Sequence, residues 1–218
     1  MEPASRAGLA SLRPAARRRR INVARRQELL RRLQDLVLAE GFALLTVDDI
    51  AARMQCSKST LYALSSSREY LVTTAVKHFF RDATARIEDR IAGIGDPAER
   101  IAVYLAAVGT EMRRMSPACY ADMVSHDSTS GIYAVNSAAA ARRVREFIRE
   151  GIDAGMFRPV HAEFVGEAVG LLIDGIQHGQ LLARTGLSSG DAFTELSDVV
   201  LAALTNMSPR GVAASSAG

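Results

Sequence analysis

The 218-residue sequence lacks the features that mark secreted, disulfide-stabilised or membrane-spanning proteins. It has only two cysteines, Cys56 and Cys119, which form no CxxC pair, and no signal-peptide h-region. No apolar run reaches the roughly 18 residues that a membrane-spanning helix needs. These absences predict a protein of the reducing cytoplasm that has no membrane partner and depends on neither disulfides nor a zinc knuckle.

Sequence motifs of catalysis are absent as well. The four histidines are scattered, and the sequence contains no HExxH, no GxSxG and no phosphate-cradling glycine loop. Neither cysteine has an obvious base nearby in the sequence. We therefore expect no enzyme, no cofactor and no metal site.

Period-two runs of β-branched residues, the mark of strands, are also missing. Apolar residues instead recur at spacings of three and four, as in Leu29, Leu33, Leu36 and Val37, and glycine or Ser/Asp-Pro pairs separate such segments. The pattern predicts an all-α protein of about nine helices.

Basic residues are concentrated near the start of the chain, and only Lys58 and Lys77 among them are lysines. Residues 1–70 hold 13 Lys+Arg and 7 Asp+Glu, whereas the remainder holds 14 and 17. Such asymmetry is typical of nucleic-acid binding, because neutralising phosphates releases condensed counterions. A basic segment that only keeps the chain soluble is the alternative.

The first 20 residues, "MEPASRAGLASLRPAARRRR", have no apolar periodicity and predict a flexible basic arm. Arg19 and Arg20 at its end are candidate DNA contacts. An organelle transit peptide and a solvated tail without specific contacts are the alternatives. At the other end, residues 208–218 predict a disordered tail.

Residues 21–68 have the plan of a helix-turn-helix domain. A helix beginning at about Val23 stops at Gly41, and Thr46 starts an approximate capping box that opens a short second helix. Ser57 caps a third short helix, and Ser67 can cap a long fourth one. The second helix of such a motif lies in the major groove with its N-terminal residues against the bases.

Short hydroxyl side chains at the start of the third helix would let its backbone N–H groups approach a phosphate, which the helix dipole also favours. Further along, Tyr62 can donate its hydroxyl to another phosphate, and Arg68 can clamp the flanking strand. The alternative is that the serines and threonines only cap helices. The candidate DNA contacts of the motif are Thr46, Ser57, Lys58, Ser59, Thr60, Tyr62 and Arg68.

The run "RQELLRRLQDLVLAEGFALLTVDDIAARMQCSKSTLYALSSSREYL", from Arg26 to Leu71, resembles without a gap the DNA-binding domain of TetR-family transcriptional regulators. The resemblance implies a homodimer that binds double-stranded operator DNA, most often as a repressor, and a C-terminal helical bundle that binds an effector and forms the dimer. It implies phosphate contacts from Thr46, Thr60, Tyr62 and Arg68. It makes Lys58 and Ser59 candidate base readers.

The sequence departs from the family pattern at the turn and after the third helix. Gln55 stands where the family usually has glycine, which predicts a non-glycine residue in a left-handed conformation at a cost of about 1 kcal/mol. Leu64 and Ser65 stand where the family usually has His-Phe. Without that phenylalanine, we expect a weaker brace between the motif and the fourth helix.

Residues 69–207 predict the effector-binding and dimerisation domain. Helices are expected over about 162–184 and 190–206, and the first carries Gly166, Gly170, Gly175 and Gly179. Glycine costs helix stability, so we interpret these four as a close-packed dimer seam, with packing inside one chain as the alternative.

The same domain offers residues for an effector site. Methionine at irregular spacing suits a cavity for a small apolar molecule, although a methionine or aromatic stripe is also typical of plain core. Asp174 and His178, four residues apart, could meet an effector or form a structural hydrogen bond. The candidates are Tyr104, Met112, Met115, Tyr120, Met123, His126, Phe147, Phe164, Asp174 and His178. A helical small-molecule receptor with a degenerate helix-turn-helix and no operator is the competing function.

Overall fold

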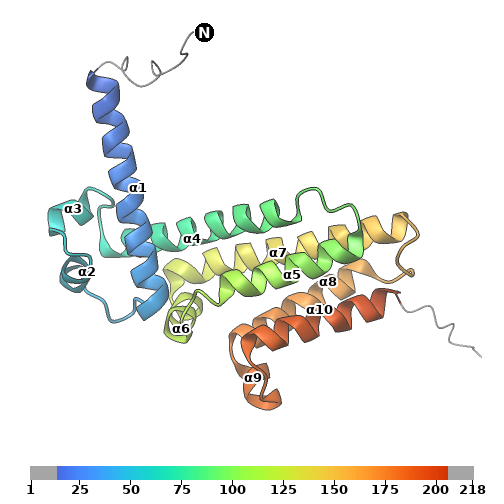
Figure 1. Ribbon diagram of the computed structural model, residues 1–218. Helices are drawn as coiled ribbons and strands as arrows, with labels where there is room; N and C mark the ends of the chain where they lie inside the picture. Colours follow the sequence, from blue (N-terminus) through green and yellow to red (C-terminus); the bar gives the residue numbers. More distant parts are fainter. Residues whose placement is uncertain (1–13, 206–218) are drawn as a thin grey trace, which may run out of the picture. The chain divides into compact units, whose positions relative to one another are not determined.

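The computed structural model describes residues 14–205 and places them in ten α-helices, with no strand in that range (Figure 1). The all-α prediction is confirmed. The helices are α1 (Pro14–Glu40), α2 (Val47–Arg53), α3 (Lys58–Tyr62), α4 (Arg68–Ile91), α5 (Pro97–Met112), α6 (Pro117–Ser125), α7 (Asp127–Asp153), α8 (Ala162–Gln177), α9 (Gln180–Thr185) and α10 (Ser189–Thr205).

The first helix begins at Pro14, earlier than the start at about Val23 that apolar periodicity predicts. Proline is favoured in the first turn of a helix, and the alanines and arginines that follow it are strong helix formers. The backbone of Arg19 and Arg20 is therefore helical. The rest of the predicted arm, residues 1–13, and the predicted tail over 208–218 lie outside the described residues.

The single late helix expected over 162–184 is wrong, because the structure divides it into α8 and α9. Gly179, between them, has a φ of +70°, a left-handed conformation that glycine adopts without steric cost. The apolar pattern continues across this break, so periodicity alone does not reveal it. Gly179 thus lies between two helices rather than inside one.

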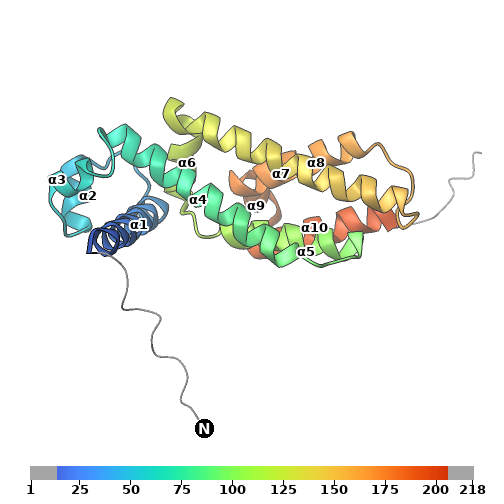
Figure 2. The same cartoon turned by 90° about the horizontal axis from the view of Figure 1, so that it is seen from above.

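The chain forms two compact units, and the boundary between Phe79 and Phe80 falls inside α4 rather than at residue 68. In the first unit, α2 and α3 contact each other next to α1, as both ribbon views show (Figures 1 and 2). Leu33, Ile50 and Leu61 are fully buried and come from these three helices. Their burial fixes α3 on the unit and leaves its other face to solvent.

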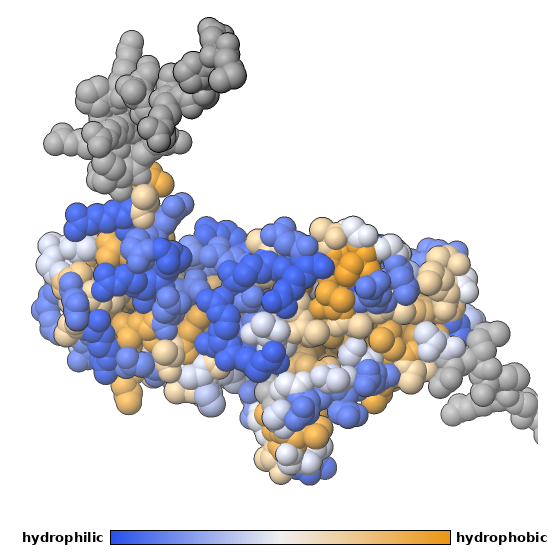
Figure 3. All heavy atoms as spheres, in the orientation of Figure 1, coloured by the Kyte–Doolittle hydropathy of each residue, from blue (hydrophilic) through white to orange (hydrophobic). Residues whose placement is uncertain are grey.

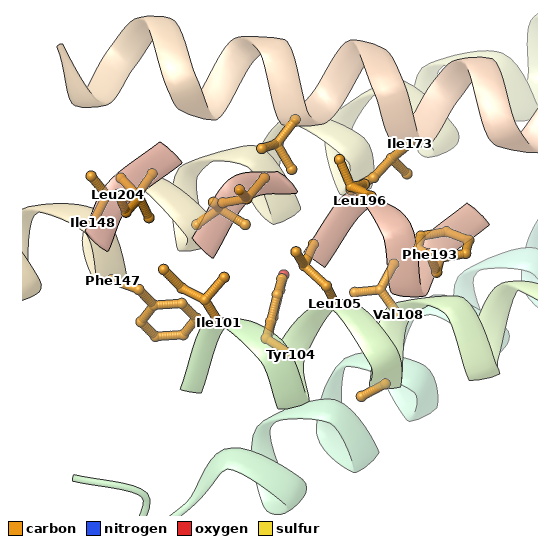
Figure 4. Packing of buried hydrophobic residues seen from close by; sticks show 14 of the residues in the cluster. Ile101, Tyr104, Leu105, Val108, Phe147, Ile148, Ile173, Phe193, Leu196 and Leu204 are labelled. Carbon is orange, nitrogen blue, oxygen red and sulfur yellow. The ribbon is translucent and has the colours of Figure 1, made fainter. Parts of the chain in front are cut away.

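The second unit is a helical bundle in which α5, α7, α8 and α10 pack together. Its core includes Leu105, Phe147 and Phe193 from three different helices, each at most 2% exposed (Figure 4). The second half of α4 joins this bundle through ion pairs. The guanidinium of Arg86 binds the buried carboxylate of Glu111 on α5 at 2.7 and 2.8 Å.

Candidate nucleic-acid interface and effector cavity

A capping box opens α2, as the sequence predicts. The Asp49 N–H donates to the Thr46 hydroxyl oxygen at 3.1 Å, and the Thr46 N–H donates to the Asp49 carboxylate at 2.9 Å. Hydrogen bonds from the Thr46 hydroxyl and N–H hold the pKa of Asp49 below its usual value. Thr46 is exposed at this helix end, where its hydroxyl is already hydrogen-bonded to Asp49.

The turn between α2 and α3 contains Gln55 with a φ of +48°, so the predicted left-handed non-glycine residue is confirmed. Hydrogen bonds on both sides hold this conformation: the Cys56 N–H donates to the Ala51 carbonyl at 3.0 Å, and the Arg32 side chain donates to the Met54 carbonyl. The turn thereby sets the angle at which α3 leaves α2.

Helix α3 presents a hydroxyl cluster at its start. The Ser57 hydroxyl oxygen accepts from the Thr60 N–H at 3.2 Å, and it lies 2.8 Å from the hydroxyl oxygens of both Ser59 and Thr60. These side chains do cap the helix, as the alternative interpretation expects. Ser57, Lys58 and Ser59 are nevertheless exposed, so the same groups can also meet a ligand from outside.

Lys58 pairs with the carboxylate of Asp48 on α2 at 2.5 Å. The hydrogen bond to Asp48 raises the pKa of Lys58 above its usual value, so the ammonium stays charged. Both side chains are more than half exposed, and a pair in solvent contributes little stability. Lys58 can therefore leave Asp48 for another anion at small cost.

The two residues that replace the family's His-Phe are accommodated. Leu64 is 7% exposed and belongs to the core of the unit, and Ser65 is half-buried. The Arg26 guanidinium donates to the Leu64 carbonyl at 3.3 Å, which ties α1 to the end of α3. Burial of Leu64 and this hydrogen bond thus hold the end of α3 against α1, and the weaker brace to α4 stays a prediction.

Arg68 is not positioned as a phosphate clamp, the role that was predicted for it. Its half-buried guanidinium donates to the carbonyls of Phe42, Ala43 and Leu45, with the Ala43 bond at 3.0 Å. Loop carbonyls have no helical partners, and a rigid fork of N–H donors satisfies several at once. Arg68 therefore holds the loop between α1 and α2, and a phosphate contact would compete with these bonds.

Two arginines that the sequence analysis missed lie beside the start of α3. Arg25 and Arg26 of α1 line a shallow depression together with Ser59 and Thr60. The basic run before Leu29 was the available signal, but sequence spacing does not show which of its members face another helix. Tyr62, half exposed, completes the polar groups of α3. On the face in view in Figure 3, hydrophilic side chains cover most of this unit.

The second unit encloses a cavity of about 300 Å³ among α4, α5, α7 and α8. Its walls are mainly apolar, and Tyr104 and Met112 are the predicted effector residues that line it. The other lining residues are Phe80, Ala83, Thr84, Ile87, Glu88, Val108, Tyr133, Asn136, Ser137, Ala139, Ala140, Arg142, Arg143, Glu146, Gly170, Ile173 and Gln177.

A polar network adjoins this cavity through Tyr133 and Gln177 and brings Tyr120, Asp174 and His178 together. The Tyr120 hydroxyl lies 2.9 Å from His178 Nδ1, and the Tyr133 hydroxyl lies 2.9 Å from Asp174 Oδ1 and 2.6 Å from Gln177 Oε1. Burial raises the pKa of Tyr120 to about 12, so its hydroxyl stays protonated. The sequence analysis missed Tyr133 and Gln177, whose importance depends on contacts between α7 and α8.

Gln177 lines a second cavity as well. That cavity measures about 220 Å³ and is also lined by Tyr120 and Met115, two of the predicted effector residues. The Tyr120–Tyr133–Asp174–Gln177–His178 network therefore lies where residues of the two cavities meet. Within it, the Asp174–His178 contact at 3.4 Å matches the structural hydrogen-bonding alternative.

Six of the predicted effector residues line neither cavity: Asp174 and His178, which belong to the network, and four others. Phe147 is fully buried in the core, where its ring packs edge-on against Tyr104, and Met123 is buried on α6. His126 precedes α7, and its ring nitrogen bonds the Asp122 carbonyl at 2.8 Å. Phe164 is 73% exposed on α8. Residue type predicted these positions, but helix rotation decides which cavity, core or surface each one faces.

The α8 glycines pack inside the chain. A Cβ at Gly166 would lie 2.1 Å from the Arg145 Cγ of α7, and one at Gly170 would lie 3.5 Å from the Ala141 Cβ. Gly166 therefore lets α8 approach α7 closely, which matches the internal-packing alternative, whereas the distance at Gly170 is an ordinary contact that a Cβ could make. Gly175 has only ordinary contact distance to Leu181.

The described residues lack both a metal-binding cluster and a membrane-spanning helix. No group of three or more His, Cys, Asp or Glu side chains there is arranged to hold a metal ion. None of the helices between residues 14 and 205 is long and apolar enough to cross a bilayer.

Comparisons with known proteins give structural relatives only. No protein-family profile matches the sequence, and no curated protein does. A transcriptional regulator from Saccharomonospora viridis, solved in complex with choline, is 18% identical with a TM-score of 0.71, over 84% of this chain and 99% of its own. A TetR transcription regulator from Haloarcula marismortui has a TM-score of 0.70, 18% identity and coverages of 84% and 99%.

A third relative is the ketosteroid transcriptional regulator KstR2 of Mycobacterium tuberculosis, which is 22% identical with a TM-score of 0.58, over 84% of this chain and 95% of its own. At these identities the likeness establishes the fold. The chain is thus built like TetR-family transcriptional regulators, with an N-terminal helix-turn-helix and a C-terminal helical bundle. The relatives from Saccharomonospora viridis and Haloarcula marismortui are both named as transcription regulators.

Proposed function

We propose that the protein is a cytoplasmic, DNA-binding transcriptional regulator, a homodimer whose DNA affinity is controlled by a small molecule. One observation carries the proposal. Ser57, Lys58 and Ser59 are exposed at the start of α3 in the helix-turn-helix unit. Over most of its length, the chain has the fold of TetR-family regulators.

In the proposed complex, α3 enters the major groove and Lys58 reads base edges, for which it leaves Asp48. Ser59 lies beside it on the exposed side of the helix. The side chains of Thr46, Ser57, Thr60 and Tyr62 bind phosphates of the DNA backbone. Arg25 of α1, which was not predicted from the sequence, adds a further phosphate contact. Arg19 and Arg20 are proposed as further DNA contacts. Arg68 acts indirectly by fixing the loop.

The cavity of about 300 Å³ is proposed as the effector site, because it is mostly apolar and holds a few polar groups, as ligand sites do. The choline bound to the Saccharomonospora viridis relative supports a small-molecule effector in principle. We propose repression that is released by the effector, through a population shift toward a dimer whose reading helices no longer fit successive major grooves.

The proposed dimer surface is the outer face of α8 and α10, which contact each other. It carries exposed apolar side chains at Phe164, Leu171 and Leu172 of α8 and Val199 of α10. Exposed apolar groups in such number on two adjacent helices are typical of an interface. The seam therefore uses these side chains rather than Gly166 and Gly170, which face α7.

Selection of bound sequences from random duplex DNA tests the function, followed by affinity measurements across a range of salt. We expect one roughly palindromic site, and an affinity that falls steeply with salt because several phosphates are neutralised. Lys58→Ala should relax the sequence preference at particular base pairs by about 1–3 kcal/mol. The matched variant Lys77→Ala, an exposed lysine on α4, should leave that preference unchanged.

The competing function, a small-molecule receptor with a degenerate motif, predicts a different result. In that case no duplex would be selected, and any affinity at low salt would be equal for all sequences. This outcome would leave small-molecule binding in the cavity as the only proposed function.

A further inference from the structure

We propose that the cavity of the bundle takes an uncharged, mostly apolar molecule that carries a carbonyl oxygen, and that the Tyr104 hydroxyl donates a hydrogen bond to this oxygen. The inference rests on the proposed function, since it names the ligand class of the proposed effector site.

Tyr104 carries a hydroxyl that the protein leaves unused. Tyr104 projects from α5 among the residues of the core (Figure 4). It is 5% exposed and lines the cavity, and its hydroxyl has no hydrogen-bond partner among the described residues. Among those same residues, no fully enclosed side-chain nitrogen or oxygen lacks a partner. The Tyr104 hydroxyl must therefore be open to space, and the space that Tyr104 lines is the cavity.

This hydroxyl remains a donor at every physiological pH. Burial, with the nearby carboxylate of Glu88, raises the pKa of Tyr104 far above its usual value. A protonated phenol in an apolar cavity is satisfied best by a ligand acceptor. A carbonyl oxygen accepts that proton and brings no donor of its own that the apolar walls would leave unpaired.

The charged residues at the cavity disfavour a charged ligand. Arg143 donates to both carboxylate oxygens of Glu88 at 3.0 and 2.9 Å and to Glu146 at 2.9 Å, so three of its five N–H donors are already committed. A ligand carboxylate would lose its water, meet two carboxylates and have only the exposed guanidinium of Arg142 as a second cation of the lining. An ammonium would find both carboxylates held by Arg143, whose guanidinium also lies 4.5 Å from the centre of the Phe147 ring.

The remaining walls fit an apolar body. Phe80, Ile87, Val108 and Ile173 surround the space and come from three helices. The volume of about 300 Å³ lies at the lower end of the range of ligand sites. A compact molecule with one ring and a polar oxygen at one end matches these dimensions.

A series of four probes with the same apolar body tests the inference by calorimetry on the full chain without DNA. The probes are para-isopropylacetophenone, para-isopropyltoluene, para-isopropylbenzoate and para-isopropylbenzylamine. We expect the ketone to bind more tightly than the other three. Tyr104→Phe, which removes only the hydroxyl, should weaken the ketone about five- to tenfold and leave the hydrocarbon unchanged.

Tyr70→Phe, which removes an exposed hydroxyl on α4, is the matched control and should change neither probe. Thermal unfolding of Tyr104→Phe without ligand verifies that the variant folds. The inference is overturned if the benzoate or the amine binds as tightly as the ketone, if Tyr104→Phe weakens ketone and hydrocarbon equally, or if the ketone does not bind at millimolar concentration.

Measurement of DNA binding separates this inference from the proposed function. Ketone binding that depends on Tyr104 in a protein that selects no DNA would support the ligand class and reject the regulator. Selective DNA binding by a protein that fails the probe series would support the regulator and reject the ligand class.

Discussion

The guanidinium of Arg68 fixes the loop that leads into the helix-turn-helix. It donates to three carbonyls between Phe42 and Leu45, and unpaired loop carbonyls away from water are costly. Arg68→Ala should therefore lower the free energy of unfolding by about 1–3 kcal/mol in urea titrations. Arg90→Ala, an exposed arginine of α4, serves as the control. Unchanged stability combined with weaker binding to all DNA sequences would restore the phosphate-clamp role.

Gln55 pays a steric cost in the turn before α3, since its φ of +48° places Cβ close to the backbone. Gln55→Gly should raise the free energy of unfolding by up to about 1 kcal/mol, measured by the shift of the urea midpoint at constant slope. Gln55→Ala keeps the Cβ and should show no such gain. Destabilisation by glycine would mean that the glutamine side chain contributes more than the backbone strain costs.

At the scale of elements, α8 contacts α7 through a glycine. The Cβ of Gly166→Ala would clash with Arg145 Cγ and lie 3.3 Å from the Ala141 carbonyl oxygen, so we expect a loss of about 1–3 kcal/mol on chemical unfolding. Gly175→Ala meets Leu181 at 3.9 Å and should gain up to about 1 kcal/mol from helix propensity. Equal effects would contradict the α7–α8 contact at Gly166.

The link between α4 and α5 depends on pH. Hydrogen bonds from Arg86 and Arg114 hold the pKa of Glu111 below its ordinary value of 4.5. A lowered pKa in the folded state means that the pair stabilises fully above about pH 4.5 and loses this contribution as pH falls through the folded-state pKa.

Glu111→Gln should therefore destabilise the protein by about 1–2 kcal/mol at pH 7, a value reduced because Arg86 is partly exposed, and much less at pH 3. Urea unfolding at both pH values measures the difference. Glu195→Gln, an exposed residue of α10, should have no effect at either pH. An effect of Glu111→Gln that is equal at the two pH values would show that shape, and not charge, matters at this position.

At the scale of the whole molecule, the proposed dimer depends on the outer face of α8. Leu171 is 74% exposed, so Leu171→Glu should change the stability of a single subunit by less than about 0.5 kcal/mol. In the dimer it would bury a charge, so sedimentation should show monomers, and affinity for a palindromic site should fall. Val135→Glu, 68% exposed on α7, is the control. A Leu171→Glu dimer that is unchanged would move the interface elsewhere.

Local sequence patterns predicted the caps of the helix-turn-helix, because capping depends on residues close together in the chain. The Thr46–Asp49 capping box and the Ser57 cap follow from neighbours within three positions, whereas the left-handed Gln55 was implied by the resemblance to the family pattern. The break at Gly179 was missed because a glycine inside an apolar helical pattern is compatible with both a continuous helix and a stop.

The sequence by itself therefore determined the helical class, the capped and exposed start of α3 and the basic character of the first unit. Tertiary structure alone decided that Arg68 faces its own loop, that Gly166 packs on α7, and that Tyr104 and Tyr133 share a cavity while Phe147 does not. These outcomes depend on how each helix is rotated and against which partner it packs. Such contacts join residues far apart in the chain, and a periodic pattern identifies an apolar face without naming its neighbour.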